Sequence, residues 1–291
     1  MTDGIRFAMG GAIFGDLKLE HLDMIEHMGF PGIEPYRGWI MEWVDRPVEL
    51  KDELDKRAIT MVTCSNGGPN QSTDFINPDN RSKTIDDHLA FARDFLCVFG
   101  CEHFKINMGA RPAGGTRQMD LRNIAETLNE LGERLLGECN IKLAPHPHIW
   151  GPIERPEEVD QMLELTDPRY VWWIPDTAQL NLGGGDPLEL MTRHYDRMAA
   201  VHWKDSAASY RGYTGPTPTR AQHEMSILYK DLGTGGVDLP GIWKLLLDRG
   251  WHGWITLDLD PPRRNEGEGT YEQKAEINRR YLLETLKVGR L

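Results

Sequence analysis

Eight short runs of β-forming residues occur along this chain, and they alternate with longer segments that have helical spacing. The predicted strands cover residues 5–9, 32–36, 60–64, 103–108, 141–145, 170–176, 198–202 and 253–258. Parallel strands need a long crossover connection, which is usually a helix. The alternation therefore predicts parallel βαβ units with helices packed on the sheet.

The predicted helices favour a closed arrangement of these units. They cover residues 17–28, 83–99, 120–139, 156–165, 187–194, 239–249 and 271–288. Gly29, Gly100 and Gly250 stand where three of them should stop. No GxGxxG follows the first strand, which argues against an open dinucleotide-binding sheet. The predicted fold class is α/β, a (β/α)8 TIM barrel, with residues 1–291 as a single domain.

Two connections are longer than a barrel requires, residues 65–80 and residues 204–238. Both follow a predicted strand, so both should lie at the carboxyl-end face, where barrel enzymes build their active sites. We expect them to be active-site loops.

The composition excludes several classes of protein. The formal net charge is −12 and the basic residues are scattered, so neither nucleic acid nor an anionic membrane surface is an expected partner. No stretch approaches about eighteen uninterrupted apolar residues, and the first residues lack a signal-peptide pattern, so we expect a cytoplasmic protein. The four cysteines form no CxxC pair and are predicted to be reduced thiols; they are Cys64, Cys97, Cys101 and Cys139.

Polar residues at the strand ends should converge at one mouth of the barrel, although they lie far apart in the sequence. The candidates are Glu34, Lys105, Asn107, His146, His148, Asp176, His202, Lys204, Asp258 and Asp260. Each of the last four predicted strands supplies a histidine or an aspartate, which are ligand types that Mn, Mg, Co and Zn accept. This pattern favours a metal site. The alternatives are structural histidines, and ion pairs of Asp258 or Asp260 with Arg263 and Arg264.

Two motifs place a pair of functional groups on one face of an extended chain. In Ala-Pro-His-Pro-His, His146 and His148 point the same way and the prolines prevent a helix; the alternative is a stiff loop whose histidines contact backbone. In Val-His-Trp-Lys-Asp, His202 lies beside Lys204, a cation that can polarise a carbonyl or hold an alkoxide. Lys204 could instead pair with Asp205 or Asp231.

A glycine run and the tryptophans have simpler interpretations. Gly183–Gly185 could cradle a phosphate, but a tight turn with Asp186 as the helix cap and Pro187 at the first helical position fits better. Most of the nine tryptophans should be packing residues. Trp39 and Trp150 follow strands and could stack on a sugar ring.

Four segments resemble a known family: Asp176–Pro187 (DTAQLNLGGGDP), Ala200–Asp205 (AVHWKD), Gly233–Asp238 (GTGGVD) and Gly253–Asp258 (GWITLD). They are similar to the xylose-isomerase-like sugar phosphate isomerase/epimerase superfamily. The likeness spans nearly the whole chain and is strongest after Ile141. The segment KLAPHPHIWG looks most like the histidine-rich segment of inosose (2-keto-myo-inositol) dehydratases.

The resemblance implies a Mn, Mg or Co site with ligands from strands five to eight, which would chelate adjacent keto and hydroxyl oxygens of the substrate. Asp176 and His202 match the family's aspartate and histidine ligands. Three positions depart from the pattern. Ala144 replaces the strand-five glutamate, Gln179 replaces the histidine of Asp-x-x-His, and Asp258 replaces the longer strand-eight glutamate. Family isomerases and epimerases shuttle a proton with that glutamate pair, so the departures favour elimination.

We therefore predict a divalent-metal-dependent lyase or dehydratase that acts on a keto-cyclitol or keto-sugar by β-elimination through an enolate. The predicted metal ligands are Asp176, His202, Asp258 and His146, with manganese as the expected ion and Mg, Co or Zn as alternatives. The predicted catalytic residues are Lys204, which holds the enolate oxygen, and His148 and Glu34, which donate or accept protons. The predicted substrate-binding residues are Trp39, Lys105, Asn107, Trp150, Gln179, His223 and Asp260.

Two other functions stay open. One is a sugar isomerase or epimerase that works through an enediolate held at the metal. The other is a non-catalytic sugar-binding subunit with a decayed site. A homo-oligomer, or a small partner subunit that completes the mouth, is also compatible with the sequence.

Overall fold

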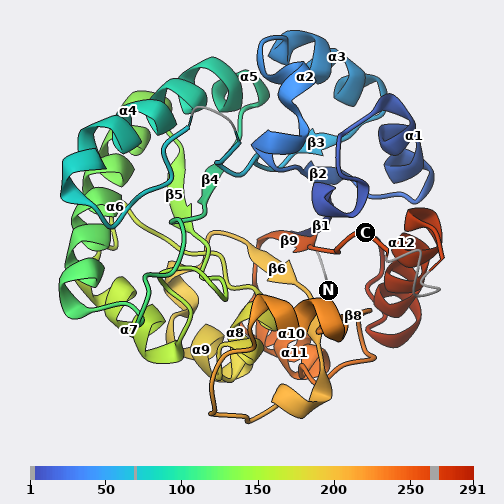
Figure 1. Cartoon of the computed structure of the whole chain (residues 1–291). Helices are drawn as coiled ribbons and strands as arrows, with labels where there is room; N and C mark the ends of the chain where they lie inside the picture. Colours follow the sequence, from blue (N-terminus) through green and yellow to red (C-terminus); the bar gives the residue numbers. More distant parts are fainter. Residues whose placement is uncertain (1–3, 69–70, 263–268) are drawn as a thin grey trace.

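The computed structural model describes residues 4–68, 71–262 and 269–291. Parallel strands surround a common centre, and helices cover the outside (Figure 1). Five strands pair in the order β3, β2, β1, β9, β6, and β4 pairs with β5. Their bounds are β1 Ile5–Gly10, β2 Gly32–Glu34, β3 Thr60–Met61, β4 His103–Ile106, β5 Lys142–Pro145, β6 Val201–Trp203 and β9 Gly253–Leu257. The predicted fold class, a (β/α)8 barrel, is confirmed.

The sixth predicted strand, residues 170–176, is a series of isolated bridges rather than a continuous strand. Ile174 N donates to Pro145 O of β5 at 3.0 Å, and His202 N of β6 donates to Pro175 O at 2.9 Å. Pro175 has no N–H, so it cannot contribute a donor to a regular ladder. The segment nevertheless connects β5 to β6 and continues the ring.

The contact between β3 and β4 is also irregular. Lys105 N donates to the Thr63 side-chain oxygen at 3.4 Å, where a ladder would use a backbone carbonyl. Asn66 N donates to Lys105 O, also at 3.4 Å. These two bonds join the two sheets on the side opposite residues 170–176.

The helices largely match the predicted segments. They are α1 Leu19–His27, α2 Met41–Val44, α3 Pro47–Lys56, α4 Arg81–Phe91, α5 Cys97–Phe99, α6 Gln118–Cys139, α7 Pro156–Leu165, α8 Thr177–Leu182, α9 Pro187–Arg193, α10 Arg220–Met225, α11 Leu239–Asp248 and α12 Tyr271–Arg280. A π-helical stretch, Ala92–Leu96, joins α4 to α5 and so forms the single predicted helix. Asp186 caps α9 through Leu188 N and Glu189 N, which confirms the predicted turn. No helix in the described ranges is long and apolar enough to cross a membrane.

Some elements were not predicted. Helix α3 lies between β2 and β3, with Pro47 in its first turn and Leu50 and Leu54 buried on one face. The long connection 204–238 contains α10 and a small antiparallel pair, β7 (Asp205–Ser206) with β8 (Tyr229–Lys230). The assignment of residues 65–80 and 204–238 as active-site loops stays a prediction.

Alternation along the strands separates two buried regions. The main core contains residues such as Phe7, Leu143 and Ile255, packed between strands and helices. A second, smaller cluster consists of Ala8, Val62, Ala144, Ile174, Ala200 and Trp254, which lie on the opposite strand faces. These faces point into the barrel. The next residues on the same faces, toward the carboxyl ends, are His146, Asp176, His202 and, one step further, Asp258.

Candidate functional site

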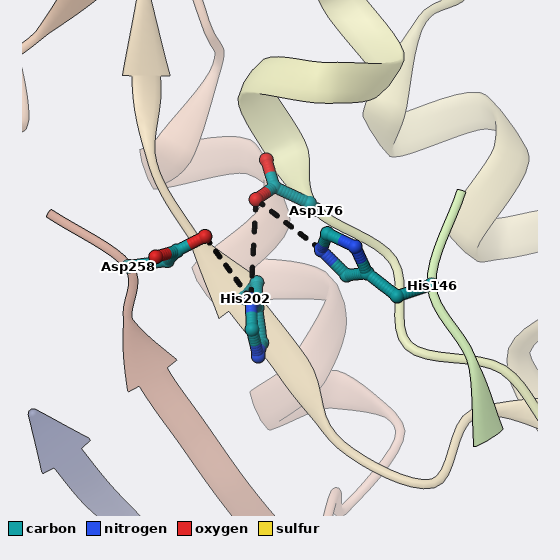
Figure 2. A group of neighbouring side chains, drawn as sticks. All are labelled: His146, Asp176, His202 and Asp258. Atoms are coloured by element: carbon teal, nitrogen blue, oxygen red, sulfur yellow. Dashed lines mark ion pairs between the residues drawn. The ribbon is translucent and has the colours of Figure 1, made fainter. Parts of the chain in front are cut away.

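Four side chains from adjacent strand ends meet at the carboxyl-end mouth of the barrel: His146, Asp176, His202 and Asp258. Each offers one ligand atom, and these atoms all lie within 4.8 Å of one another. The four side chains come from separate strand ends and point toward one another (Figure 2). All four residues are almost completely buried. We call this group the four-residue cage.

Nitrogen and oxygen atoms of the cage residues lie near one another, but too far apart for most hydrogen bonds. Asp176 Oδ2 lies 3.5 Å from His146 Nε2 and 3.9 Å from His202 Nδ1. Asp258 Oδ2 lies 3.5 Å from His202 Nδ1. These separations are longer than most hydrogen bonds, so the groups face one another without bonding directly.

Several buried atoms of the cage have no hydrogen-bond partner in the described part of the chain: both ring nitrogens of His146, Asp176 Oδ2 and His202 Nδ1. Buried polar atoms are nearly always satisfied, and each exception calls for an explanation such as an ion. Two imidazole nitrogens and two carboxylate oxygens are a donor set that divalent ions accept. The cage can therefore hold a divalent cation.

Neighbouring groups orient two of the cage side chains. Asp176 is the N-cap of α8, and its Oδ1 accepts hydrogen bonds from Ala178 N and Gln179 N, both at 2.9 Å, which leaves Oδ2 for the cage. His202 Nε2 lies 2.8 Å from Glu34 Oε1, so Nε2 donates to that carboxylate and Nδ1 faces the cage. Thr256 Oγ1 donates to the other Glu34 oxygen at 2.7 Å.

The surroundings set the charge of the cage residues. Burial lowers the pKa of His146 well below its ordinary value, and Lys105 and His202 add to the shift, so the ring is neutral and has a lone pair on one of its two nitrogens. Burial alone would raise the pKa of Asp258, but the Lys204 ammonium and His202 hold it well below its usual range. Burial raises the pKa of Asp176, and the nearby Asp258 carboxylate raises it further.

Two buried lysines flank the cage. Lys204 Nζ lies 3.7 Å from Asp258 Oδ2 and 3.2 Å from Asp260 Oδ2. Burial would lower its pKa, but Asp258 and Asp260 raise it well above the ordinary value, so Lys204 is a permanent cation. It does not form the alternative ion pair with Asp205, and Asp231 pairs with Lys274. Arg263 and Arg264, the alternative partners for Asp258 and Asp260, lie outside the described residues.

The second lysine, Lys105, lies at the other side, with Nζ 3.3 Å from Glu34 Oε1 and 3.4 Å from Tyr36 Oη. Glu34 is also fully buried, and His202 and Lys105 together outweigh that burial and lower its pKa far below the usual range. A carboxylate held ionised in this way is poorly suited to donate a proton. Glu34 contacts both His202 and Lys105, and its predicted role in proton transfer stays a prediction.

A cavity of about 320 Å³ opens beside the cage. Its lining includes His146, His148, Asn107, Trp150 and Arg220. His148 Nδ1 lies 2.5 Å from Ile149 O; a carbonyl only accepts, so Nδ1 carries the proton and Nε2 is left with a lone pair. Burial, and then His146, lower the pKa of His148 to about 4. Both histidines of the Pro-His-Pro-His segment thus reach the mouth.

The predicted substrate residues occupy three positions. Asn107 lines the cavity, and the Asn66 amide holds its backbone N–H and C=O at 2.7 and 2.9 Å. Trp39 packs edge-on against Tyr36, a residue of the cavity lining, with ring centroids 4.7 Å apart. Asp260 and His223 lie on the other side of the cage, beside Lys204, around a small pocket of about 30 Å³.

Trp150 is held firmly at the entrance of the cavity. Its φ of 67° is uncommon for a residue other than glycine. Its indole Nε1 donates to Pro218 O at 2.7 Å, its backbone N donates to Glu154 Oε2 at 2.7 Å, and its carbonyl accepts from Arg111 N. The indole therefore ties the loop after β5 to the long connection 204–238.

The sequence interpretation missed four residues of this region. Tyr36 and Thr256 follow the period-2 alternation of Glu34 and Asp258, and that alternation could have indicated them. Tyr229 and Arg220 belong to the long connection, where no such pattern exists. Lys204 Nζ lies 4.1 Å from the centroid of the Tyr229 ring.

A family model described as xylose isomerase-like TIM barrel matches residues 22–281. The chain belongs to this family. A curated relative, the inosose dehydratase of Clostridium tetani, is 30% identical over 172 residues, which are 56% of this chain and 54% of the relative. The chain thus spans about half the length of the curated relatives that it matches.

Two solved structures of the same fold are proteins whose names differ from those of the curated relatives. IolI protein, solved with a bound zinc atom, aligns with 98% of this chain and 99% of its own at a TM-score of 0.77 and 13% identity. D-psicose 3-epimerase from Clostridium cellulolyticum H10, solved with D-tagatose, aligns with 98% and 100% at a TM-score of 0.75 and 13% identity. At this identity the likeness shows the fold.

The three departures from the xylose isomerase-like pattern have separate outcomes in the structure. Ala144 is fully buried in the interior cluster, one step below His146 on the same strand face. Gln179 does not face the cage, because its amide donates to Tyr229 Oη at 2.9 Å and accepts from Ile149 N at 3.3 Å. Asp258 still reaches the cage despite its shorter side chain.

Proposed function

We propose that this protein is a divalent-metal-dependent lyase that dehydrates a keto-cyclitol or keto-sugar by β-elimination through an enolate. The observation that carries the proposal is the four-residue cage, with its unpartnered buried nitrogen and oxygen atoms, beside a cavity whose lining includes His148. The names of the curated relatives, inosose dehydratases, support the same reaction class.

In this proposal His146, Asp176, His202 and Asp258 hold the cation. Manganese is the expected ion, and Mg, Co or Zn are alternatives for the same mixed donor set. A divalent cation there supplies Lewis acidity, which polarises a carbonyl and makes the adjacent C–H more acidic. Glu34 is a positioning residue that fixes the orientation of His202.

His148 is the proposed base. Its Nδ1–H is committed to Ile149 O, and Nε2 has no partner in the described residues, so Nε2 is free to accept the α-proton of the substrate. In the elimination the C–H bond breaks toward Nε2, its electron pair forms the enolate, and the β-C–O bond then breaks. The proton on Nε2 returns to the departing hydroxyl, and water leaves.

One residue carries the proton in both steps because the cavity offers no second base of the usual kind. No aspartate or glutamate occurs in its lining among the described residues. An epimerase needs proton transfer on both faces of the enediolate, for which Ala144 and the lysine-paired Asp258 provide no second base. The lack of a second base among the described lining residues favours elimination over epimerisation.

Lys204 is the proposed stabiliser of the negative charge that develops on the substrate oxygen. Its ammonium is buried, permanently charged and fixed by two carboxylates, so it can act on that charge without first reorganising. Asn107, Lys105, Trp39, Trp150, His223 and Asp260 are the proposed substrate-binding residues, and Gln179 is the proposed link between the β5 loop and Tyr229. Cytoplasmic location and a homo-oligomer or small partner subunit stay predictions.

The test uses the full chain, stripped of metal and reloaded with Mn²⁺, incubated with 2-keto-myo-inositol and with a 3-keto-glucoside. Mass spectrometry should detect a product that has lost one water. Asp176→Asn should abolish turnover, because it keeps the size of the side chain but removes an anionic ligand. The matched control is Asp186→Asn, which changes a helix cap of the same kind on α9 and should leave turnover intact.

His148→Gln separates the base from the cage. It should lower turnover by about 10²- to 10⁴-fold, the usual contribution of an acid–base group, without changing the affinity for Mn²⁺. A product of unchanged mass would support the isomerase or epimerase alternative. Sugar binding with no turnover under any metal would support a non-catalytic binding protein.

A further inference from the structure

The long connection 204–238 brings one arginine to the entrance of the cavity. Arg220 is the first residue of α10, and it lines the 320 Å³ cavity together with His148 and Asn107. Its guanidinium carbon lies 4.5 Å from the centroid of the Trp150 ring. Arg220 is exposed, so its guanidinium is accessible from solvent.

Arg220 differs from other arginines near the mouth because it has no acidic partner among the described residues. The chain has 45 acidic and 33 basic residues, and other arginines near the mouth are paired: Arg111 lies 2.8 Å from Glu158, and Arg155 lies 3.9 Å from Glu157. Arg220 forms no ion pair or hydrogen bond with any residue in the described ranges, and the cavity lining there has no carboxylate. A cation is thus kept beside the cavity without an acidic partner.

Holding Trp150 in place does not explain this arginine. Trp150 is already fixed through its indole N–H, its backbone N–H and its carbonyl. An exposed cation–π contact contributes about 0.5–1 kcal/mol at most, which is small beside these three bonds. We infer instead that Trp150 positions Arg220, because the fixed indole ring holds the guanidinium at a defined place.

We propose that the substrate carries an anionic oxygen group, a carboxylate or a phosphate, which Arg220 binds at the cavity entrance while the keto end faces the four-residue cage. This inference rests on the proposed function for the identity of the reacting end. A guanidinium binds both kinds of anion through two parallel N–H···O bonds, and a flat aromatic surface behind it limits its rotation. The neutral residues around it supply the hydroxyl-binding part of the site.

The experiment measures binding and does not depend on turnover. Isothermal titration of the Mn²⁺-loaded full chain compares three unreactive cyclitols: myo-inositol, the carboxylate quinate, and myo-inositol 1-phosphate. At least one of the two anions should bind tenfold or more tightly than myo-inositol, as expected for charge-assisted hydrogen bonds. The anion that binds more tightly, quinate or myo-inositol 1-phosphate, shows whether the site prefers a carboxylate or a phosphate. The ratio of its affinity to that of myo-inositol should fall as salt is added.

Arg220→Gln should remove this advantage and leave the affinity for myo-inositol unchanged. The matched control is Arg249→Gln, since Arg249 also lies over an aromatic ring, that of Tyr195 at 5.3 Å, but belongs to the end of α11. Equal affinity for all three cyclitols, no binding of either anion, or an advantage that survives Arg220→Gln would overturn the inference. Failure of the proposed function is a separate result, because it appears as missing turnover with intact anion binding.

Discussion

Replacing Glu34 by glutamine tests whether this residue orients a metal ligand or donates a proton. Glu34 Oε1 accepts from His202 Nε2 at 2.8 Å, and the other oxygen accepts from Thr256. Glutamine keeps the shape but replaces one oxygen by NH₂. If the NH₂ faces His202, the ring loses its acceptor and can turn its lone pair away from the cage; if it faces Thr256, a neutral oxygen replaces the charged one.

The expected loss is about ten- to hundredfold in metal affinity, the usual effect of removing the hydrogen-bond partner of a metal-binding histidine. This corresponds to about 1.4–2.8 kcal/mol. The assay is a competition titration of the metal-free protein with Mn²⁺ or Zn²⁺ and a chelator of known affinity, at a pH well above the range in which histidine titrates.

The substitution also removes the buried partner of Lys105, so a loss of stability must be separated from a loss of metal binding. Glu158→Gln is the matched control, because Glu158 is buried and paired with Arg111 away from the cage. Both variants should unfold more readily, but only Glu34→Gln should bind metal less tightly. Metal affinity within twofold of the wild type in Glu34→Gln would refute the orienting role.

Three further predictions concern metal binding and the stability of the fold. Removal of metal by EDTA should lower the melting temperature, and Mn²⁺ at a hundred times its Kd should restore about 2.7 kcal/mol; equal melting curves would contradict a cation in the cage. Asp205→Asn should destabilise the fold by at least about 2 kcal/mol in urea, because either oxygen accepts two backbone N–H groups and the new NH₂ must face two of them. Burial lowers the pKa of His88 from 6.5 to about 4, so as the pH falls the unfolded chain binds a proton before the folded chain does. The free energy of unfolding should therefore be constant above pH 6.5 and fall between pH 6.5 and pH 4 by up to about 1.4 kcal/mol per pH unit. The slope should be shallower in His88→Gln, and an unchanged slope would contradict this assignment.

The cage was predictable because it depends on two regular features, the alternation of a strand and the closure of a barrel. His146, Asp176, His202 and Asp258 each follow an interior-facing residue at an even spacing. Once the strands are parallel and the ring is closed, these groups have to meet. No knowledge of the helices or of the loop conformations is needed.

The partners of the cage were not predictable in the same way. Glu34 lies 168 residues from His202, and their contact depends on the register of β2 on β1, of β1 on β9 and of β9 on β6. Composition and spacing contain no information on that register. Arg220 was missed for a different reason, because the long connection has no periodicity to indicate which side chains turn inward.

Local departures from regular structure also limited the prediction. Pro175 reduces the sixth strand to isolated bridges, and the Thr63 hydroxyl replaces a ladder acceptor between β3 and β4. A pattern of β-forming residues locates such segments but not their bonds. Helix α3 could have been predicted, since Leu50 and Leu54 have helical spacing after Pro47.

The charges at the mouth connect the cage to the proposed anion site. The carboxylates around the cage are Glu34, Asp176, Asp258 and Asp260, and the cations among them are Lys105 and Lys204. Metal binding requires neutral histidines and ionised carboxylates, and in that state this group has two uncompensated negative charges, which burial makes costly. A divalent cation cancels that excess. The metal-loaded cage would then have no excess of positive charge to attract an anionic substituent of the substrate. The described lining of the cavity has no carboxylate that would repel such a group, and its one cation is Arg220 at the entrance. Arg220 is therefore the residue that we expect to bind the anion.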